Sequence, residues 1–314
     1  MPASPIKIAV LDDYQGVALK LADWSSIQER AEVTVFRDNI TDQKALAERL
    51  APFDVICVMR ERTPLNGALL QQLTKLKFLV TSGYRNASID TETLERLGIP
   101  LGFTGSTSHA PTEMTWALIL AAMRQIPSET ANMRAGDWQK TVGKDLNGAT
   151  IGLVGLGKTG AAMARIAKAF EMNVIAWSQN LTTEKAAEGG ATAVSKEELF
   201  KQADVVSVHL VLSDRSRGIV GAPELAAMKR DAWIVNTSRG PLIDKDALIA
   251  ALKAGQIAGA ALDVYDVEPP PKDDPFRSLP NVIATPHLGF VTEKTYRIMY
   301  GGMVENIETW LAAH

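Results

Sequence analysis

Short apolar runs alternate along the chain with segments whose apolar residues recur at helical spacing. This alternation predicts strands buried in parallel sheets and helices that cover both faces of those sheets. The longest helices are expected at 111–126, where Pro111 suits a first helical turn, and at 293–311. Strands are expected at 8–11, 33–36, 55–59, 78–80, 151–154, 172–178, 205–208, 233–235, 260–264 and 282–284.

The expected strands fall into two series, one in the first hundred residues and one from residue 151 to about residue 284. A chain of 314 residues is long enough for two domains that each bury a core. Ser195, followed three residues later by Glu198, has the pattern of a capping box and predicts a helix start in the second series. The proline-rich segment 268–280 predicts a long loop. The pattern as a whole predicts an α/β protein.

Glycines follow the first strand of the second series in the spacing G-x-G-x-x-G. Gly155, Gly157 and Gly160 come directly after 151–154, and a strongly helical segment follows at 161–170. In this setting Gly155 permits a tight turn, Gly157 lets backbone N–H groups approach a pyrophosphate, and Gly160 lets helix and strand pack closely. The N-terminus of the helix offers N–H dipoles to the phosphates. Strand, glycines and helix together favour a dinucleotide-binding loop over a purely structural turn.

Three ionisable residues, Arg239, Glu268 and His287, each follow one of the last three expected strands. Ligands of open parallel sheets bind beyond the carboxyl ends of the strands, so these side chains should face the edge where a dinucleotide lies. Taken singly, each could be a solvated charge or a structural edge histidine. Their coincidence behind a dinucleotide loop favours a catalytic group.

The chemistry of these three side chains is complementary. Hydride transfer to a ketone needs a proton donor for the oxygen, which a histidine can supply. A nearby carboxylate favours the protonated imidazole and fixes its orientation. An arginine can bind a substrate carboxylate through two parallel hydrogen bonds and so place the carbonyl carbon. The residues therefore predict an oxidoreductase that uses a nicotinamide coenzyme.

Four segments, taken in order, resemble the signatures of the D-isomer-specific 2-hydroxyacid dehydrogenases. They are the glycine loop 155–160, Asn-Thr-Ser-Arg-Gly at 236–240, Asp-Val-Tyr-Asp-Val-Glu-Pro at 263–269 and Thr-Pro-His-Leu-Gly at 285–289. The resemblance extends over essentially the whole chain. It implies a flavodoxin-like substrate domain formed by residues 1–104 and 289–314. A Rossmann NAD(P)-binding domain, residues 105–288, would be inserted in it, with parallel sheets in both.

The same resemblance implies roles for individual residues. Arg239 would bind the substrate, His287 would be the acid–base, and Glu268 would be its partner. Residues 111–148 would contribute to the interface of a homodimer. The substrate-binding residues would be Gly83, Tyr84, Arg60, Arg239 and His287. The coenzyme-binding residues would be Gly155, Gly157, Lys158, Thr159, Gly160, Ser178, Gln179, Asn180, Leu210, Val211, Thr237, Ser238, Arg239, Asp263, His287 and Gly289.

The chain departs from the family pattern in the substrate loop. The family often has a second glycine and an Asp-Asn pair there, whereas this loop reads Gly83-Tyr84-Arg85-Asn86. Gly83 can still offer backbone N–H groups to a carboxylate, but the residues after it make the rim bulkier. Arg60, in another loop on the substrate side, either binds a second anionic group of the substrate or is a solvated loop charge. The residues therefore leave the identity of the 2-oxo acid open.

The second departure concerns the coenzyme. An acidic residue after the second strand of a Rossmann domain binds the ribose 2′-hydroxyl of NAD and repels the phosphate of NADP. Here Ser178, Gln179 and Asn180 stand at that place, and all three can donate hydrogen bonds to phosphate oxygens. No arginine follows the strand directly, although Lys185 is close in the sequence. The sequence predicts use of both NAD and NADP, with a modest preference for NADP(H).

The composition of the chain argues against some classes of function. A net charge of −3 gives no basic footprint for nucleic acid or anionic membrane, and 46% hydrophobic with 22% charged residues is typical of a soluble protein. The single cysteine, Cys57, lies in an apolar run and is expected in the core. Residues 1–7 lack the apolar segment of a signal peptide, so a cytoplasmic location is expected. We expect no metal.

Two alternatives stay open at this point. One is a D-3-phosphoglycerate dehydrogenase, in which case the regulatory domain of many such enzymes would be missing after the last helix. The other is a nucleotide-sensing corepressor with the same fold, against which the lack of a basic patch argues.

Overall fold

The computed structural model describes residues 5–313, and the chain divides into two compact units. Unit 1 extends to Thr107 and resumes at Val291, while unit 2 runs from Ser108 to Phe290. The expectation for the N-terminal segment lies partly outside the described residues, which enter the first strand at Ile6. No described helix is long and apolar enough to cross a membrane.

Unit 1 contains a parallel sheet with the strand order β2-β1-β3-β4-β5. The buried strands β3 and β4 form its centre because their residues are apolar on both faces, and Cys57 on β3 is fully buried, as expected. The order is that of flavodoxin-like domains. The elements are β1 (Ile6–Val10), α1 (Ala18–Leu21), α2 (Ser25–Gln28), β2 (Ala31–Val35), α3 (Gln43–Leu50), β3 (Val55–Val58), α4 (Gly67–Leu70), β4 (Phe78–Thr81), α5 (Thr91–Leu97), β5 (Leu101–Phe103) and α13 (Glu293–Ala312).

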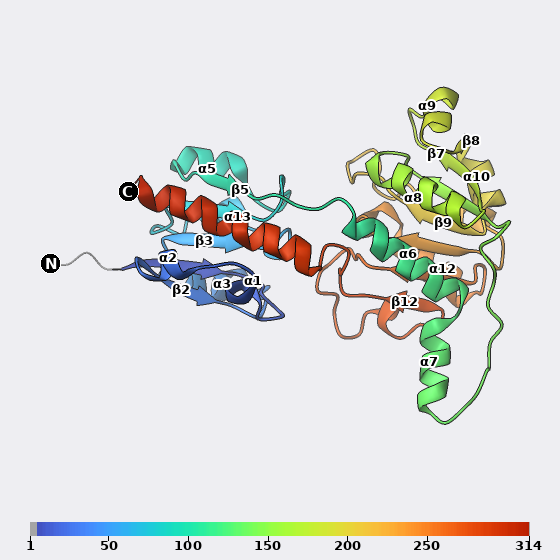
Figure 1. The fold of residues 1–314 in the computed structure, drawn as a ribbon, viewed down its shortest axis with the longest axis horizontal. Coiled ribbons are helices and arrows are strands. Elements are labelled where there is room, and N and C mark those ends of the chain that lie inside the picture. The colour runs from blue at the N-terminus through green and yellow to red at the C-terminus, as the bar shows by residue number, and fades with distance from the viewer. Residues whose placement is uncertain (1–4, 314) are drawn as a thin grey trace. The chain divides into compact units, whose positions relative to one another are not determined.

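The last helix, α13, completes unit 1 and lies beside its sheet (Figure 1). It packs against α1, α2, β4 and β5 and buries a stripe of large side chains that includes Tyr300, Met303 and Ile307. The Trp310 ring stacks on Phe78 of β4 at 5.7 Å between centroids. Segments from both ends of the chain therefore share one core.

Unit 2 contains a parallel sheet with the strand order β12-β11-β10-β9-β6-β7-β8. Alternate residues of its strands enter two cores, one on each face: Val206 and Ile234 on one side, Val205 and Val235 on the other. The elements are α6 (Ala110–Met123), α7 (Ile126–Arg134), β6 (Thr150–Val154), α8 (Lys158–Ala169), β7 (Asn173–Trp177), α9 (Thr183–Glu188), β8 (Thr192–Ala193), α10 (Lys196–Gln202), β9 (Val205–Val208), α11 (Ala222–Ala227), β10 (Trp233–Asn236), α12 (Lys245–Lys253), β11 (Gly259–Leu262) and β12 (Val282–Ala284), with 3-10 turns at Gly240–Leu242 and Pro275–Arg277.

The α/β class and the parallel sheets are confirmed in both units. The capping box at Ser195 is also confirmed, because its side chain accepts from the Glu198 N–H while the Glu198 carboxylate accepts from the Ser195 N–H. The short strands β5 and β8 were not predicted, since each is only two or three residues long. Such short strands carry too little periodicity to be recognised.

The helix expected at 111–126 was wrong at its end. α6 stops at Met123, Gln125 adopts a left-handed backbone with φ 54°, and a separate helix, α7, begins at Ile126. Pro127 in the first turn of α7 is compatible with a helix start but would interrupt a continuous helix. Helix α7 buries none of its residues, so it carries no apolar stripe by which it could have been predicted.

Candidate active site

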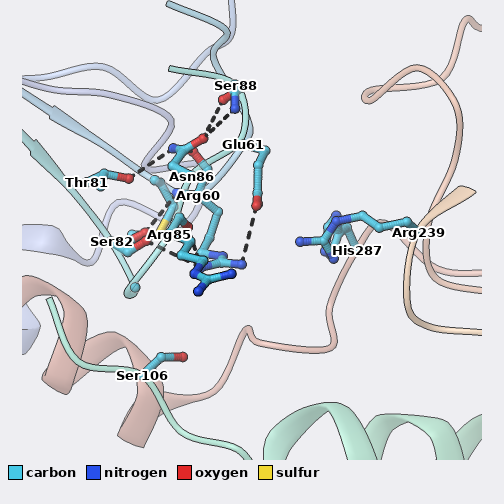
Figure 2. Close-up of polar contacts among 12 residues, drawn as sticks. Arg60, Glu61, Thr81, Ser82, Arg85, Asn86, Ser88, Ser106, Arg239 and His287 are labelled. Atoms are coloured by element: carbon cyan, nitrogen blue, oxygen red, sulfur yellow. Dashed lines mark hydrogen bonds and ion pairs between the residues drawn. The ribbon is translucent and has the colours of Figure 1, made fainter. Parts of the chain in front are cut away.

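The three predicted catalytic residues follow neighbouring strands at one edge of the unit 2 sheet. In the register of this sheet, the last residues of β10, β11 and β12 (Asn236, Leu262 and Ala284) stand level with one another. Because the strands are parallel, the loops that carry Arg239, Glu268 and His287 all leave from the carboxyl edge. Figure 2 draws Arg239 and His287 in the same region of unit 2.

Glu268 and His287 form a hydrogen-bonded pair, with 2.5 Å between Glu268 Oε2 and His287 Nδ1. The other carboxylate oxygen, Oε1, accepts from the Tyr265 N–H at 2.9 Å, which fixes the carboxyl group. The edge of the Phe290 ring packs against the imidazole at 5.4 Å between centroids. Since Nδ1 is engaged by Glu268, Nε2 is the ring nitrogen available to a reacting group.

The carboxylate of Asp263 holds the loop that carries His287 in place. This carboxylate is fully buried and accepts from the N–H groups of Leu288 and Gly289, at 2.8 and 2.7 Å, and from the Thr285 hydroxyl at 2.5 Å. Burial raises the pKa of Asp263, and these hydrogen bonds oppose the rise. His287 itself has a left-handed backbone with φ 53°, a strained conformation that surrounding contacts must maintain. Asp263 therefore positions the loop that carries His287, a role that the sequence did not predict.

Arg239 is presented by a turn that Asn236 closes. The Asn236 side chain accepts from the Ser238 N–H at 3.0 Å and donates to the Arg239 carbonyl at 2.8 Å. The next residue, Gly240, packs directly on the neighbouring loop, because a Cβ there would lie 2.2 Å from the Tyr265 carbonyl carbon. The loop that carries Arg239 and the loop 265–268 therefore pack directly against each other. This role of Gly240 was not predicted from the sequence.

The glycine loop joins β6 to α8 with the geometry that dinucleotide binding needs. Gly155 has φ 102°, and a Cβ on it would lie 2.7 Å from the His209 carbonyl oxygen. A Cβ on Gly160 would lie 2.2 Å from the Gly155 carbonyl oxygen, so the helix and the loop approach too closely for any side chain. By contrast, a Cβ on Gly157 would meet nothing within 4 Å, and α8 begins at the next residue, Lys158. Open space beside a helix N-terminus fits a bound pyrophosphate.

The other predicted coenzyme residues of unit 2 also lie in loops at this carboxyl edge. Ser178, Gln179 and Asn180 follow β7, and Leu210 and Val211 follow β9, where the Val211 side chain is exposed. Two hydroxyls are engaged within the protein: that of Thr237 lies 2.7 Å from the Thr115 hydroxyl, and that of Ser238 donates to the Val208 carbonyl at 2.9 Å. Because both hydroxyls are already hydrogen-bonded within the protein, a coenzyme would more readily contact the backbone of these two residues.

A half-buried histidine at the same edge was not predicted. His209 follows β9, and its Nε2 lies 2.8 Å from the Ser207 hydroxyl, while its Nδ1 has no hydrogen-bond partner among the described residues. Burial lowers the pKa of His209 to about 4, so the imidazole is neutral near pH 7. Its carbonyl packs against Gly155. Its position directly after a buried strand, beside the glycine loop, was the signal that could have identified it.

The predicted substrate residues Arg60, Gly83 and Tyr84 belong to unit 1, where they follow β3 and β4. Figure 2 shows the Arg60 side chain beside this loop, with Nη1 3.5 Å from the Ser82 carbonyl and Nη2 3.5 Å from Glu61 Oε1. A Cβ on Gly83, which has φ 84°, would lie 2.2 Å from Arg60 Nη1, so a side chain there would displace the guanidinium. Arg60 also has a left-handed backbone, with φ 54°. Its guanidinium therefore lies over the Gly83 loop.

The backbone of the Gly83 loop differs from the expectation in one respect. The Gly83 N–H donates to the Thr104 hydroxyl at 2.9 Å, so this N–H is engaged within unit 1. Asn86 fastens the loop by donating to the Arg60 carbonyl and to the Thr81 hydroxyl, at 2.6 and 2.9 Å (Figure 2). The tyrosine at the rim, Tyr84, is 71% exposed. A carboxylate would therefore have to compete with Thr104 for the Gly83 N–H.

In the part of the chain that the structure describes, no group of three or more His, Cys, Asp or Glu side chains could hold a metal ion.

Known proteins are similar to this chain in sequence and in structure. Residues 116–289 match the family described as D-isomer specific 2-hydroxyacid dehydrogenase, NAD binding domain. A phosphoglycerate oxidoreductase from Vibrio cholerae superposes with a TM-score of 0.93 at 39% identity, over 98% of this chain and all of that one (100%). Unit 2, which contains the glycine loop, therefore carries an NAD-binding domain.

Curated relatives extend the resemblance to both units. A D-3-phosphoglycerate dehydrogenase from Methanocaldococcus jannaschii is 36% identical over 96% of this chain, which spans only 59% of that longer protein. A glyoxylate reductase from Aeropyrum pernix is 37% identical over 76% of this chain and 74% of its own length. The match to the NAD-binding domain and these two relatives together show that the chain belongs to the D-isomer-specific 2-hydroxyacid dehydrogenase family.

Proposed function

We propose that the chain interconverts a 2-oxo acid and the corresponding D-2-hydroxy acid with NAD(P)(H). The observation that carries the proposal is the Glu268–His287 pair at the carboxyl edge of an NAD-binding domain, with Arg239 on the adjacent loop. Glyoxylate reductase and hydroxypyruvate reductase activities in relatives support it. The D configuration rests on the family alone.

In the reducing direction, each side chain has one task. Arg239 binds the substrate carboxylate through its planar fork and so orients the carbonyl carbon. His287 donates a proton from Nε2 to the carbonyl oxygen, and Glu268 stabilises the charged imidazole through Nδ1. A nicotinamide coenzyme, when bound at the glycine loop, supplies the hydride. In the oxidising direction His287 accepts the proton from the hydroxyl.

In unit 1, the Gly83 loop with Arg60 and Tyr84 is the proposed substrate-binding part. The position of the Arg60 guanidinium over Gly83 supports binding of an acid with a second anionic group, as in the relatives named D-3-phosphoglycerate dehydrogenase.

Assays of glyoxylate, hydroxypyruvate, pyruvate, phenylpyruvate and phosphohydroxypyruvate with NADH and NADPH test the reaction. The variant Arg239→Lys keeps the charge but loses the planar fork, so kcat/KM should fall by about tenfold or more for every 2-oxo acid that the wild type reduces. Its coenzyme affinity, measured by fluorescence titration, should change much less. Wild-type kinetics in Arg239→Lys would place the carboxylate elsewhere, and coenzyme binding without turnover of any 2-oxo acid would favour a nucleotide sensor.

The coenzyme specificity is proposed to be dual with a modest preference for NADP(H). The residues after β7 are Ser178, Gln179 and Asn180, none of which would repel a 2′-phosphate. The variant Ser178→Asp should shift the ratio of kcat/KM values toward NADH, because it adds both an acceptor for the ribose hydroxyl and a charge that repels the phosphate. A hundredfold preference of the wild type for NADH, about 2.7 kcal/mol, would contradict the proposal.

A homodimer through residues 111–148 is also proposed. Figure 1 shows α7 projecting from the rest of unit 2, and the segment after it returns in an extended course. Large apolar side chains are exposed here, with Met133 62%, Trp138 70% and Val142 95% accessible. A second copy of the chain would cover this surface. Sedimentation equilibrium should give the mass of a dimer, and a monomer at micromolar concentration would contradict the proposal.

A further inference from the structure

A groove of about 470 Å³ runs along one flank of α8 in unit 2. The opposite flank of this helix, which includes Met163 and Ala167, is buried against the sheet. Small side chains, Ala161 and Ala162, line the groove and leave room in it. Glu188, Gly189 and Gly190 at the end of α9 line the other side, together with Ser108 and His109.

The charges around this groove are unbalanced. Lys158, Arg165 and Lys168 all line it, whereas Glu188 is its one carboxylate. Within the described residues none of the three cations forms an ion pair, although elsewhere in unit 2 lysines pair at 2.7–2.8 Å, as Lys196 does with Glu224 and Lys229 with Asp204. Three cations that share a concave surface repel one another, and a bound anion would relieve this repulsion.

Lys168 lines the groove next to the glycine turn that follows α9. A Cβ on Gly190, which has φ 82°, would lie 3.2 Å from Lys168 Nζ. The ammonium group therefore packs over the glycine turn that follows α9. Any larger residue at Gly190 would push it away, so the turn and the lysine together shape one end of the groove.

The groove is distinct from the coenzyme site, with which it shares only Lys158. The proposed coenzyme residues lie in loops at the carboxyl edge of the sheet. Lys168 stands ten residues further along α8, about 15 Å along the helix axis, at the far end of the helix. A ligand held by Arg165 and Lys168 would therefore leave the glycine loop free.

We propose that this groove binds a small anion with at least two negative charges, such as a phosphorylated metabolite. Arg165 and Lys168 would make its charge-assisted hydrogen bonds, and Lys158 would extend the site toward the glycine loop. The groove has room for a ligand of the size of a sugar phosphate or a nucleotide. Binding there requires no catalytic group and is independent of the proposed reaction.

Isothermal titration of the full chain with inorganic pyrophosphate, at fixed ionic strength and with saturating NADPH, tests the proposal. Saturation fills the coenzyme site, so the remaining binding reports the groove. The double variant Arg165→Gln/Lys168→Gln should weaken pyrophosphate binding about tenfold, the effect of removing two partly solvated charge pairs. The control Lys201→Gln/Lys253→Gln removes the same charge from exposed positions on α10 and α12 and should bind as the wild type does.

Three results would overturn the proposal. The wild type could fail to bind pyrophosphate once the coenzyme is bound, which would assign the anion to the glycine loop. The control variant could lose as much affinity as the groove variant, which would show a general charge effect. The groove variant could bind as the wild type does. Circular dichroism and coenzyme affinity should stay unchanged in both variants, because all four positions are exposed.

Discussion

Replacing His287 by alanine should slow 2-oxo acid reduction by roughly 10²–10⁴-fold, the usual contribution of a positioned acid–base group. The imidazole is a proton donor that a neighbouring carboxylate orients, through the 2.5 Å contact between Glu268 Oε2 and His287 Nδ1. Coenzyme binding should survive, because Asp263 holds the backbone of this loop by the N–H groups of Leu288 and Gly289, which the substitution leaves in place. Single-turnover kinetics would separate the chemical step from coenzyme binding.

The variant Glu268→Gln is the matched control for this pair. It retains an oxygen that can accept from the Tyr265 N–H but removes the charge that favours the protonated imidazole. We expect a smaller loss of reduction rate than in His287→Ala. Turnover close to that of the wild type in His287→Ala would exclude His287 as the proton donor. Equal rates for Glu268→Gln and the wild type at every pH would exclude the pairing.

The variant Gly160→Ala should lower the free energy of unfolding by about 1–3 kcal/mol. The added methyl would stand 2.2 Å from the Gly155 carbonyl oxygen, and because that atom belongs to the backbone of the loop, α8 and β6 must move apart. Coenzyme affinity should fall with it, since the loop loses its geometry. Urea denaturation without coenzyme measures the first effect, and fluorescence titration with NADPH measures the second.

Gly157→Ala separates folding from binding in the same loop. Its Cβ would meet no protein atom within 4 Å, and Gly157 has an ordinary φ of −76°, so the free energy of unfolding should fall by no more than about 0.5 kcal/mol. The methyl would, however, enter the space proposed for the pyrophosphate and weaken coenzyme binding by about tenfold or more. Normal coenzyme affinity in Gly157→Ala would contradict the dinucleotide-binding assignment. Normal stability in Gly160→Ala would contradict the close approach of helix and loop.

The sequence predicted the features that depend on period and on strand order. Buried parallel strands are apolar on both faces, so β3, β6 and β9 stand out as unbroken apolar runs. Once such strands are recognised, polar residues just after them must lie at one edge of the sheet. Arg239, Glu268 and His287 could therefore be placed at this edge without knowledge of any contact between them.

The features that the sequence did not predict depend on side-chain geometry between loops. Asp263 directly follows a strand. Only the hydrogen bonds at 2.7 and 2.8 Å from the Gly289 and Leu288 N–H groups show that it holds the loop that carries His287. Nothing in the sequence distinguishes Gly240 from the other glycines. Its role follows from its close approach to Tyr265, because a Cβ on Gly240 would lie 2.2 Å from the Tyr265 carbonyl carbon. Such roles are set by the distance between two loops, which periodicity does not encode.

The division of unit 1 between the two ends of the chain has a consequence for biosynthesis. Unit 2 is continuous in sequence and can fold as soon as Phe290 has left the ribosome. Unit 1 cannot complete its fold until α13 has been synthesised. Until α13 emerges, the surfaces of β4 and β5 that this helix covers stay exposed to solvent and to other nascent chains. Most of unit 1 is synthesised before unit 2, yet unit 1 is the last to complete its fold. Any need for a chaperone during translation should therefore fall on unit 1.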